Sequence, residues 1–321
     1  METLGQIKIR LFFPVLLSAI CFSACASVPG PLYSWGNYED KIYAYLQGES
    51  PAAQIGVLQN DLLKIEEKGK KAPPGYYAHL GMLYADVGDH GQAVSCFIVE
   101  KTRFPESAAF MNYLLVQPTP QASEPVGSYP DFQEGSPHSI LVMPPLNRSP
   151  DIMAPTAFLA TSTWPLAESG YYVIPVSLSS RMFRENGITV AEDAYAIAPS
   201  RLREIFGADS ALYITITRYG AKYVGVSSVV EAAATARLID LRSGLELWSG
   251  RVALSESSNS GKGNFFDMLI SAAFDQIANV LSDRAYDVGK KANHQMLSAG
   301  KKKGLLYGPY HSRYGTDLIS R

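Results

Sequence analysis

The histidines are the first residues to consider as metal ligands or catalytic bases. The chain has five: His79, His90, His138, His294 and His311. No two of them lie at a metal-ligand spacing with a cysteine or carboxylate beside them, as a zinc site requires. An isolated histidine within a helical pattern, such as His79, is more often structural than a ligand. The sequence therefore predicts no metal site.

The string SGKG at 260–263 superficially suggests a phosphate-binding loop, whose backbone donors and lysine would hold phosphates. That pattern requires glycine at the position of Glu256 and a hydroxyl residue directly after Lys262, and the chain has neither. We interpret the string as a loop between a strand and a helix, and predict no cofactor.

Hydrolase chemistry has no support in the sequence either. A serine nucleophile in the GxSxG pattern does not occur. Carboxylates such as Asp86, Asp89 and Glu100 follow helix ends and surfaces, so no pair can be assigned to acid–base work. We therefore expect a protein that is not an enzyme, and identify no small-molecule substrate.

The N-terminus has the pattern of an export signal. Lys8 and Arg10 precede an uncharged run at 11–24, which is too short to span a bilayer but suits the apolar core of a signal peptide. The run leads into FSAC at 22–25, which resembles the lipobox of bacterial lipoproteins, although Phe22 departs from the usual leucine. The resemblance implies cleavage after residue 24 and a diacylglycerol on Cys25.

The residues around this cysteine bear on where the anchor would lie. Cys21 is a second candidate acceptor, but Ile20 before it is too large for the peptidase pocket. Ala26 follows Cys25, and by resemblance to sorted lipoproteins the absence of Asp there implies the periplasmic face of the outer membrane. Each buried acyl methylene contributes roughly 0.8 kcal/mol, so several chains anchor stably. The alternative, an N-terminal membrane anchor with incidental cysteines, stays open.

Composition suits ordinary globular folding rather than nucleic-acid binding. Hydrophobic residues make up 47% and charged residues 18% of the 321, with a net charge of -2. Two domains are the natural expectation for this length, and a near-neutral chain lacks the field that attracts nucleic acid. We expect a signal peptide at 1–24, a lipidated helical domain at 25–116, a proline-rich linker at 117–137, an α/β sandwich at 138–285 and a basic, tyrosine-containing tail at 286–321.

The N-terminal domain has the periodicity of helices. Apolar residues recur at helical spacing after a Ser50-Pro51 start, and a second pattern then matches one tetratricopeptide repeat. In this repeat small residues let two antiparallel helices approach, and aromatic residues fill the gap. The matching residues are Tyr77, Leu80, Gly81, Tyr84, Gly88, Ala93, Phe97 and Pro105. Glu100 departs from the pattern, which has alanine there, and we expect flanking helices because one repeat cannot bury its own faces.

An aromatic string precedes this repeat. LYSWGNYE at 32–39, with PPGYYAHLGMLYADVGD and EKTRFPES, resembles a family of uncharacterised proteobacterial lipoproteins whose activity is unknown. From the residues alone, the aromatics form either a docking surface or an N-terminal cap on the repeat.

The C-terminal domain alternates strands and helices. Strands are expected at 139–143, 171–176, 211–217, 229–241 and 245–254, and helices at 155–169, 200–206 and 265–284. Arg242-Ser243-Gly244 forms the turn of a long hairpin. The order predicts an α/β sandwich with a mixed sheet.

Two resemblances cover this domain. Asp240, Gly244 and Trp248, in LIDLRSGLELWSGRV, resemble the hairpin of periplasmic modules that include the amino-terminal domain of the Tol propeller protein and the curli secretion lipoprotein. SILVMPPLNRS and YGPYHSRYG more closely resemble lipoproteins first noted as neisserial surface antigens, over residues 138–315. This implies a fusion of two lipoproteins that act side by side elsewhere.

These observations favour a non-enzymatic accessory or scaffold subunit of a periplasmic envelope assembly or secretion complex. Its partners would be the inner leaflet of the outer membrane, through acyl chains, and another envelope lipoprotein. A regulator of a peptidoglycan synthase or other cell-wall enzyme is the alternative. The basic tail is either a solvated segment or a contact with an anionic surface.

Overall fold

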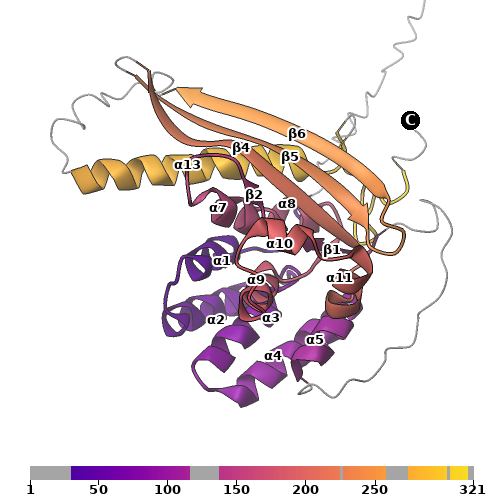
Figure 1. Ribbon diagram of the computed structural model, residues 1–321. Coiled ribbons are helices and arrows are strands. Elements are labelled where there is room, and N and C mark those ends of the chain that lie inside the picture. Colours follow the sequence, from indigo (N-terminus) through magenta and orange to yellow (C-terminus); the bar gives the residue numbers. More distant parts are fainter. Residues whose placement is uncertain (1–29, 116–136, 225–226, 258–273, 302–303, 317–321) are drawn as a thin grey trace, which may run out of the picture. The chain divides into compact units, whose positions relative to one another are not determined.

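The computed structural model describes residues 30–115, 137–224, 227–257, 274–301 and 304–316. Cys25, the proline-rich stretch and the SGKG string lie outside these residues. Pro31–Arg321 forms one compact unit. We call residues 30–115 the helical segment and residues 137–316 the sheet segment (Figure 1).

The helical segment contains only helices among its described residues: α1 (Tyr38–Leu46), α2 (Pro51–Glu67), α3 (Tyr76–Asp86), α4 (His90–Arg103), a 3-10 turn (Pro105–Ser107) and α5 (Ala108–Leu115). Pro51 occupies the first turn of α2, where its missing N–H costs nothing. The carboxylate of Asp89 accepts from the backbone N–H of Gln92 at 3.1 Å and so caps α4. The predicted helical fold of this segment is confirmed.

The sheet segment begins with short strands and helices. These are β1 (Ser139–Val142), β2 (Leu146–Asn147), α7 (Ala154–Thr161), α8 (Thr163–Glu168), β3 (Tyr172–Val173), α9 (Val176–Glu185), α10 (Ala191–Tyr195) and α11 (Pro199–Phe206). Three long strands follow, β4 (Ser210–Val224), β5 (Ser227–Asp240) and β6 (Glu246–Ser257), and then α13 (Phe274–Leu297).

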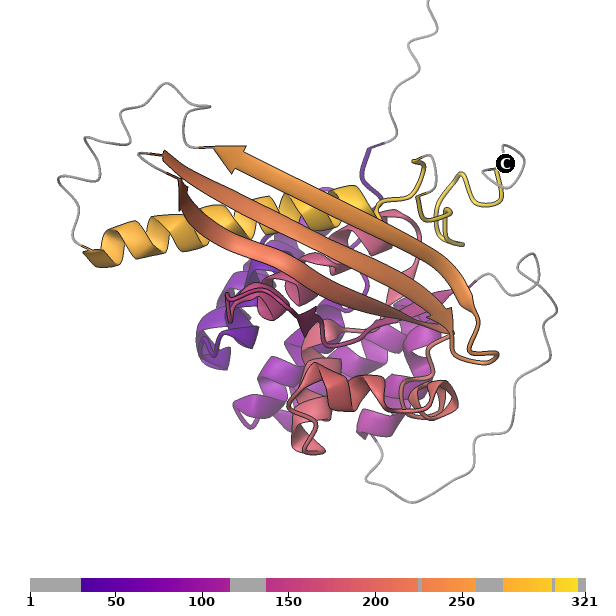
Figure 2. The same ribbon diagram turned by 45° about the horizontal axis from the view of Figure 1, so that its top comes forward.

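The strands form one mixed sheet in the order β3-β1-β4-β5-β6, with β2 also paired to β4. β1 runs parallel to β3 and β4, whereas β4, β5 and β6 are antiparallel neighbours. α13 packs against β4, β5 and β6, on the side of the sheet where the other helices lie (Figures 1 and 2). The predicted mixed sheet with a long hairpin is confirmed.

The pattern of burial along β4 and β5 explains this arrangement. Leu212, Ile214 and Ile216 are fully buried, while Thr235 and Arg237 on the other face of the sheet are exposed. Alternate side chains of a strand point to opposite faces, so the apolar face packs on helices and the polar face meets solvent.

Three predicted elements differ from the structure. The strand expected at 171–176 has only Tyr172 and Val173, because α9 begins at Val176 directly after Pro175. The helix expected at 155–169 is two helices, since Pro165 has no N–H to bond the carbonyl of Thr161. The last helix continues to Leu297, so the first third of the predicted tail is helical.

Among the described residues, no helix is both long and apolar enough to cross a membrane.

Candidate functional site between the two segments

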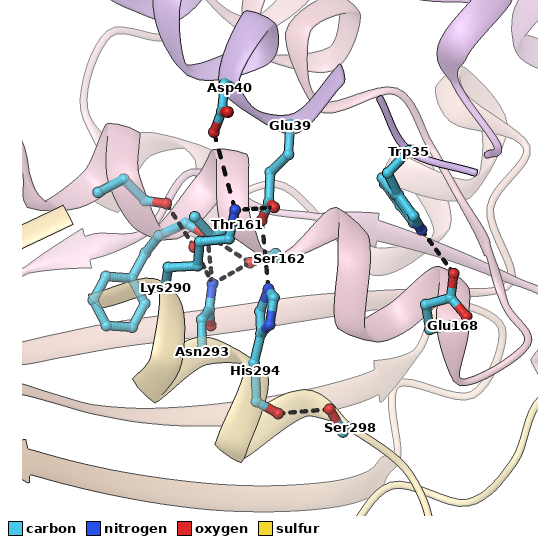
Figure 3. Close-up of polar contacts among 12 residues, drawn as sticks. Trp35, Glu39, Asp40, Thr161, Ser162, Glu168, Lys290, Asn293, His294 and Ser298 are labelled. Atoms are coloured by element: carbon cyan, nitrogen blue, oxygen red, sulfur yellow. Dashed lines mark hydrogen bonds and ion pairs between the residues drawn. The ribbon is translucent and has the colours of Figure 1, made fainter. Parts of the chain in front are cut away.

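A carboxylate of the sheet segment binds the start of the helical segment. Glu168, the last residue of α8, accepts hydrogen bonds from the backbone N–H groups of Leu32 at 2.6 Å and Tyr33 at 3.3 Å. It also accepts from the indole Nε1 of Trp35 at 2.7 Å (Figure 3). Hydrogen bonds to a charged acceptor are the stronger kind, so this one side chain fixes the path of the chain into α1.

A second carboxylate makes the reciprocal contact from the helical segment. Glu39 of α1 is 6% exposed, and its Oε2 lies 2.6 Å from Nζ of Lys290 on α13. Its Oε1 lies 3.5 Å from Nε2 of His294, an electrostatic contact rather than a good hydrogen bond. The His294 ring stacks on Trp164 with 4.4 Å between centroids. A buried carboxylate thus has its charge compensated across the contact.

Asn293 fixes the part of α13 that carries Lys290 and His294. Its side-chain amide is buried and donates to the carbonyl of Phe158 at 2.8 Å and to the hydroxyls of Thr161 and Ser162, each at 3.0 Å (Figure 3). These bonds fasten α13 to the end of α7. Lys290 and His294 are four residues apart and so lie on one face of the helix, towards Glu39.

A third carboxylate, Glu100 of α4, is completely buried between the segments. It accepts from the backbone N–H groups of Gly75 at 2.7 Å and Ala78 at 3.4 Å, at the start of α3. From the sheet segment it accepts the hydroxyl of Tyr172 at 3.1 Å. Burial raises the pKa of Glu100 to about 7, although these hydrogen bonds oppose the rise. Glu100, the departure from the repeat pattern, therefore caps a helix and joins the segments.

Further polar contacts extend along the same boundary. Nδ1 of His79 lies 2.8 Å from the hydroxyl of Ser177, and burial lowers the pKa of His79 to about 3, which keeps the ring neutral. Arg181 pairs with Asp86. His79 is thus structural, as predicted.

Aromatic packing accompanies these polar contacts. Trp35 lies 6.3 Å from Trp164 and stacks at 6.1 Å on Tyr38, measured between ring centroids. Tyr43 stacks on Tyr286 at 4.3 Å. The aromatic string also packs on the helical segment, where Tyr38 lies 4.8 Å from Tyr76 between ring centroids. These residues therefore contact both segments, and the docking and cap interpretations both stay open.

The residues of the repeat pattern lie inside the helical segment. Gly81 is where α3 and α4 approach most closely, because a Cβ there would lie 2.9 Å from the Phe97 ring. Gly88 has φ of +84° in the turn between these helices, and Pro105 begins the 3-10 turn. The other members are buried: Tyr77, Leu80, Tyr84, Ala93 and Phe97. This packing is what a repeat would need, and the tetratricopeptide assignment stays a prediction.

The three motif residues of the hairpin build its turn and edge rather than a binding site. Asp240 accepts from the backbone N–H of Ser243 at 3.1 Å, and Gly244 has φ of +74°. Trp248 covers Gly250 on β6.

The tail prediction needs correction. Lys291 pairs with Glu256 at 2.8 Å, and the guanidinium of Arg313 lies 4.8 Å from the centroid of the Tyr307 ring. Gly308 packs against Gly170, and its N–H donates to the carbonyl of Ser169 at 2.8 Å. Residues 304–316 are thus packed by hydrogen bonds onto the fold, and Lys290 and Lys291 are each paired with a carboxylate of the chain.

Other candidates for chemistry gather in no shared site. The described part of the chain holds no group of three metal-capable side chains. Cys96 is buried, and burial raises the pKa of its thiol to about 11, so the thiolate is disfavoured. His138 lies 3.7 Å from Glu106, while His311 stacks on Tyr307.

Sequence reasoning missed Glu39, Glu168, Lys290 and His294 as members of one site. Each is an ordinary polar residue whose partner lies more than a hundred residues away, and Lys290 and His294 lie in the stretch that the sequence predicts to be a tail. The aromatic string around Trp35 was the one local pattern in the sequence that indicated a contact surface here.

Comparison with known proteins assigns both segments. The family model described as "Putative lipoprotein GNA1162-like" matches residues 127–310, and "Domain of unknown function (DUF4810)" matches residues 32–114. A "Putative lipoprotein NMB1124/NMB1162" of Neisseria meningitidis serogroup B is 46% identical over 181 residues, which cover 56% of this chain and 84% of that protein.

Solved structures give further likenesses. Lipoprotein GNA1162 from Neisseria meningitidis is 48% identical, with 44% of this chain and 99% of that chain covered and a TM-score of 0.37. The PelC dodecamer from Paraburkholderia phytofirmans is 16% identical, covering 54% and 96%, with a TM-score of 0.30. The LpoB C-terminal domain from Salmonella enterica is 20% identical, covering 38% and 84%, with a TM-score of 0.26. At these TM-scores the likenesses do not bear on function.

The resemblances to the two families, at residues 32–114 and 127–310, are thereby confirmed, and the two family models divide the chain at the proline-rich stretch. The chain belongs to the GNA1162-like lipoprotein family and carries, ahead of that region, a segment of the DUF4810 family.

Proposed function

We propose that this protein is a non-enzymatic accessory subunit of a bacterial envelope assembly. It is anchored by acyl chains on Cys25 to the periplasmic face of the outer membrane, and it offers a docking body to another envelope lipoprotein. The observation that carries the proposal is that a GNA1162-like lipoprotein segment and a DUF4810 segment are joined by partly buried polar contacts into one compact unit. Such an arrangement positions surfaces rather than reactive groups.

The anchor is tested by labelling cells with radioactive palmitate. The wild-type chain should incorporate the label and fractionate with the outer membrane, because several acyl chains give stable anchoring. Cys25→Ser should abolish the label, whereas the matched variant Cys21→Ser should keep it. A Cys25→Ser protein that is still labelled, or an unlabelled wild type, would refute the anchor.

The accessory role is tested by purifying the tagged protein from membranes. A companion envelope lipoprotein should be retained, and repeated recovery of the protein alone would count against the proposal. A deletion strain separates the alternative, regulation of a cell-wall enzyme, because only that role requires an altered peptidoglycan composition.

A further inference from the structure

The contact between the segments has the composition of a protein–protein interface. Each side supplies carboxylates that are bound by groups from the other: Glu168 by Trp35 and backbone N–H groups, Glu39 by Lys290, and Glu100 by Tyr172. Interfaces between domains resemble those between separate chains, and complementary charge gives such contacts their specificity.

The sheet segment also exists without the helical segment. The matched 181 residues are 84% of the neisserial relative, which leaves about 34 of its residues outside the match. The DUF4810 match spans residues 32–114 here, far more than those residues could supply. In such a relative, the face that carries Glu168 and Lys290 in this chain has no DUF4810 segment on its own chain to bind.

We propose that one face of the sheet segment is a recognition surface for a DUF4810-type helical chain, and that the contact can form between separate polypeptides. The face consists of Trp164, Glu168, Tyr172, Ser177, Lys290 and His294. It recognises the start of the partner by three features: an indole N–H and two backbone N–H groups for Glu168, and a carboxylate for Lys290. This inference rests on the proposed function, in which the protein is a docking body, and it specifies the kind of partner that docks.

When the two segments are on one chain, a lower affinity is enough to keep them in contact. A short connection on one chain gives an effective concentration of about millimolar, so even a weak contact would stay formed. Separate chains lack this advantage, and the contact must then persist at micromolar concentration. Since the segments also share one continuous apolar core, the test must distinguish two docked bodies from a single fold that has merely been cut.

The experiment uses the full chain in detergent with a protease site inserted between Gln121 and Ala122. After cleavage at about 10 µM, where a micromolar contact stays largely formed, the two fragments should co-elute. ¹⁵N-labelled and unlabelled cleaved proteins are then mixed and followed by native mass spectrometry. Mixed pairs should appear, whereas uncut protein should give none. Fragments that separate, or that co-elute but never exchange partners, overturn the inference.

Variants locate the surface. Glu168→Ala removes the acceptor of three hydrogen bonds and should weaken the association of the cleaved fragments at least about tenfold. The matched control Glu246→Ala removes an exposed carboxylate of β6 that pairs with Arg237 of β5, and should leave the association unchanged. If Glu168→Ala does not fold before cleavage, Lys290→Gln probes the same surface from α13. Wild-type association in a folded Glu168→Ala or Lys290→Gln protein would refute the assignment.

This test is independent of the anchor. Fragments that separate while Cys25 still incorporates palmitate overturn the inference and leave the proposed function standing. A chain that incorporates no palmitate but whose fragments exchange partners overturns the proposed anchor and leaves the inference standing.

Discussion

The substitution Glu100→Gln tests how much a buried carboxylate affects the stability of this fold. Glu100 is completely buried between α3, α4 and β3, and burial raises its pKa from 4.5 to about 7. Between these two pH values the unfolded chain releases this proton while the folded chain keeps it. The contribution of Glu100 to the free energy of unfolding is therefore fully present below pH 4.5, and it is lost as the pH rises towards 7.

The size of the effect follows from the two pKa values. At about 1.4 kcal/mol per pKa unit, the loss of stability between pH 4.5 and pH 7 is about 3 kcal/mol. Glutamine cannot ionise, yet its amide oxygen in the place of Oε1 can still accept from the N–H of Gly75 and the hydroxyl of Tyr172, and only the weak 3.4 Å bond from Ala78 to Oε2 is lost to the amide nitrogen. The free energy of unfolding of Glu100→Gln should therefore change with pH by about 3 kcal/mol less than that of the wild type.

The assay is urea unfolding from pH 4.5 to pH 8, followed by tryptophan fluorescence. The informative quantity is the variant free energy minus the wild-type free energy, since other titrating groups cancel in that difference. Glu204→Gln on the surface of α11 serves as the control and should give a difference that does not depend on pH. Parallel curves for Glu100→Gln and the wild type would show that Glu100 has an ordinary pKa and refute the reasoning.

Four further substitutions test the packing. Gly81→Val places a side chain between α3 and α4 and should lower the free energy of unfolding by about 1–3 kcal/mol. Gly56→Ala lies in open space on α2 and should raise the free energy of unfolding by about 0.5–1 kcal/mol. Urea unfolding measures both, and an unchanged stability of Gly81→Val would contradict the close packing of α3 on α4. Gly308→Ala puts a Cβ 2.5 Å from the carbonyl oxygen of Gly170, so the C-terminal residues should detach and be cut faster in limited proteolysis, with unchanged cleavage as the contrary outcome. Asn293→Ala removes the side-chain donor to the end of α7 and should lower the free energy of unfolding by about 1–3 kcal/mol. The melting temperature should fall accordingly, and an unchanged melting temperature would argue that these bonds do not hold α13 to α7.

The sequence alone determined most helices and strands of this protein. The start of α2 follows from Pro51 after a polar residue, and the long hairpin follows from alternation along β5 with a turn at Gly244 into β6. Such patterns are local, because a helix repeats its faces every three to four residues and a strand every two. They were wrong where a proline interrupted the backbone pattern, as at Pro165 and Pro175.

Only the tertiary structure decided which polar residues meet. Glu168 and Trp35, or Glu39 and Lys290, lie far apart along the chain, and neither member of a pair carries a local mark of its partner. Burial turns such residues into a site, because a carboxylate removed from water must find compensating donors wherever the fold supplies them. The sequence likewise located Glu100 as a departure from a repeat, but its pKa and its role in joining the segments follow from what surrounds it in space.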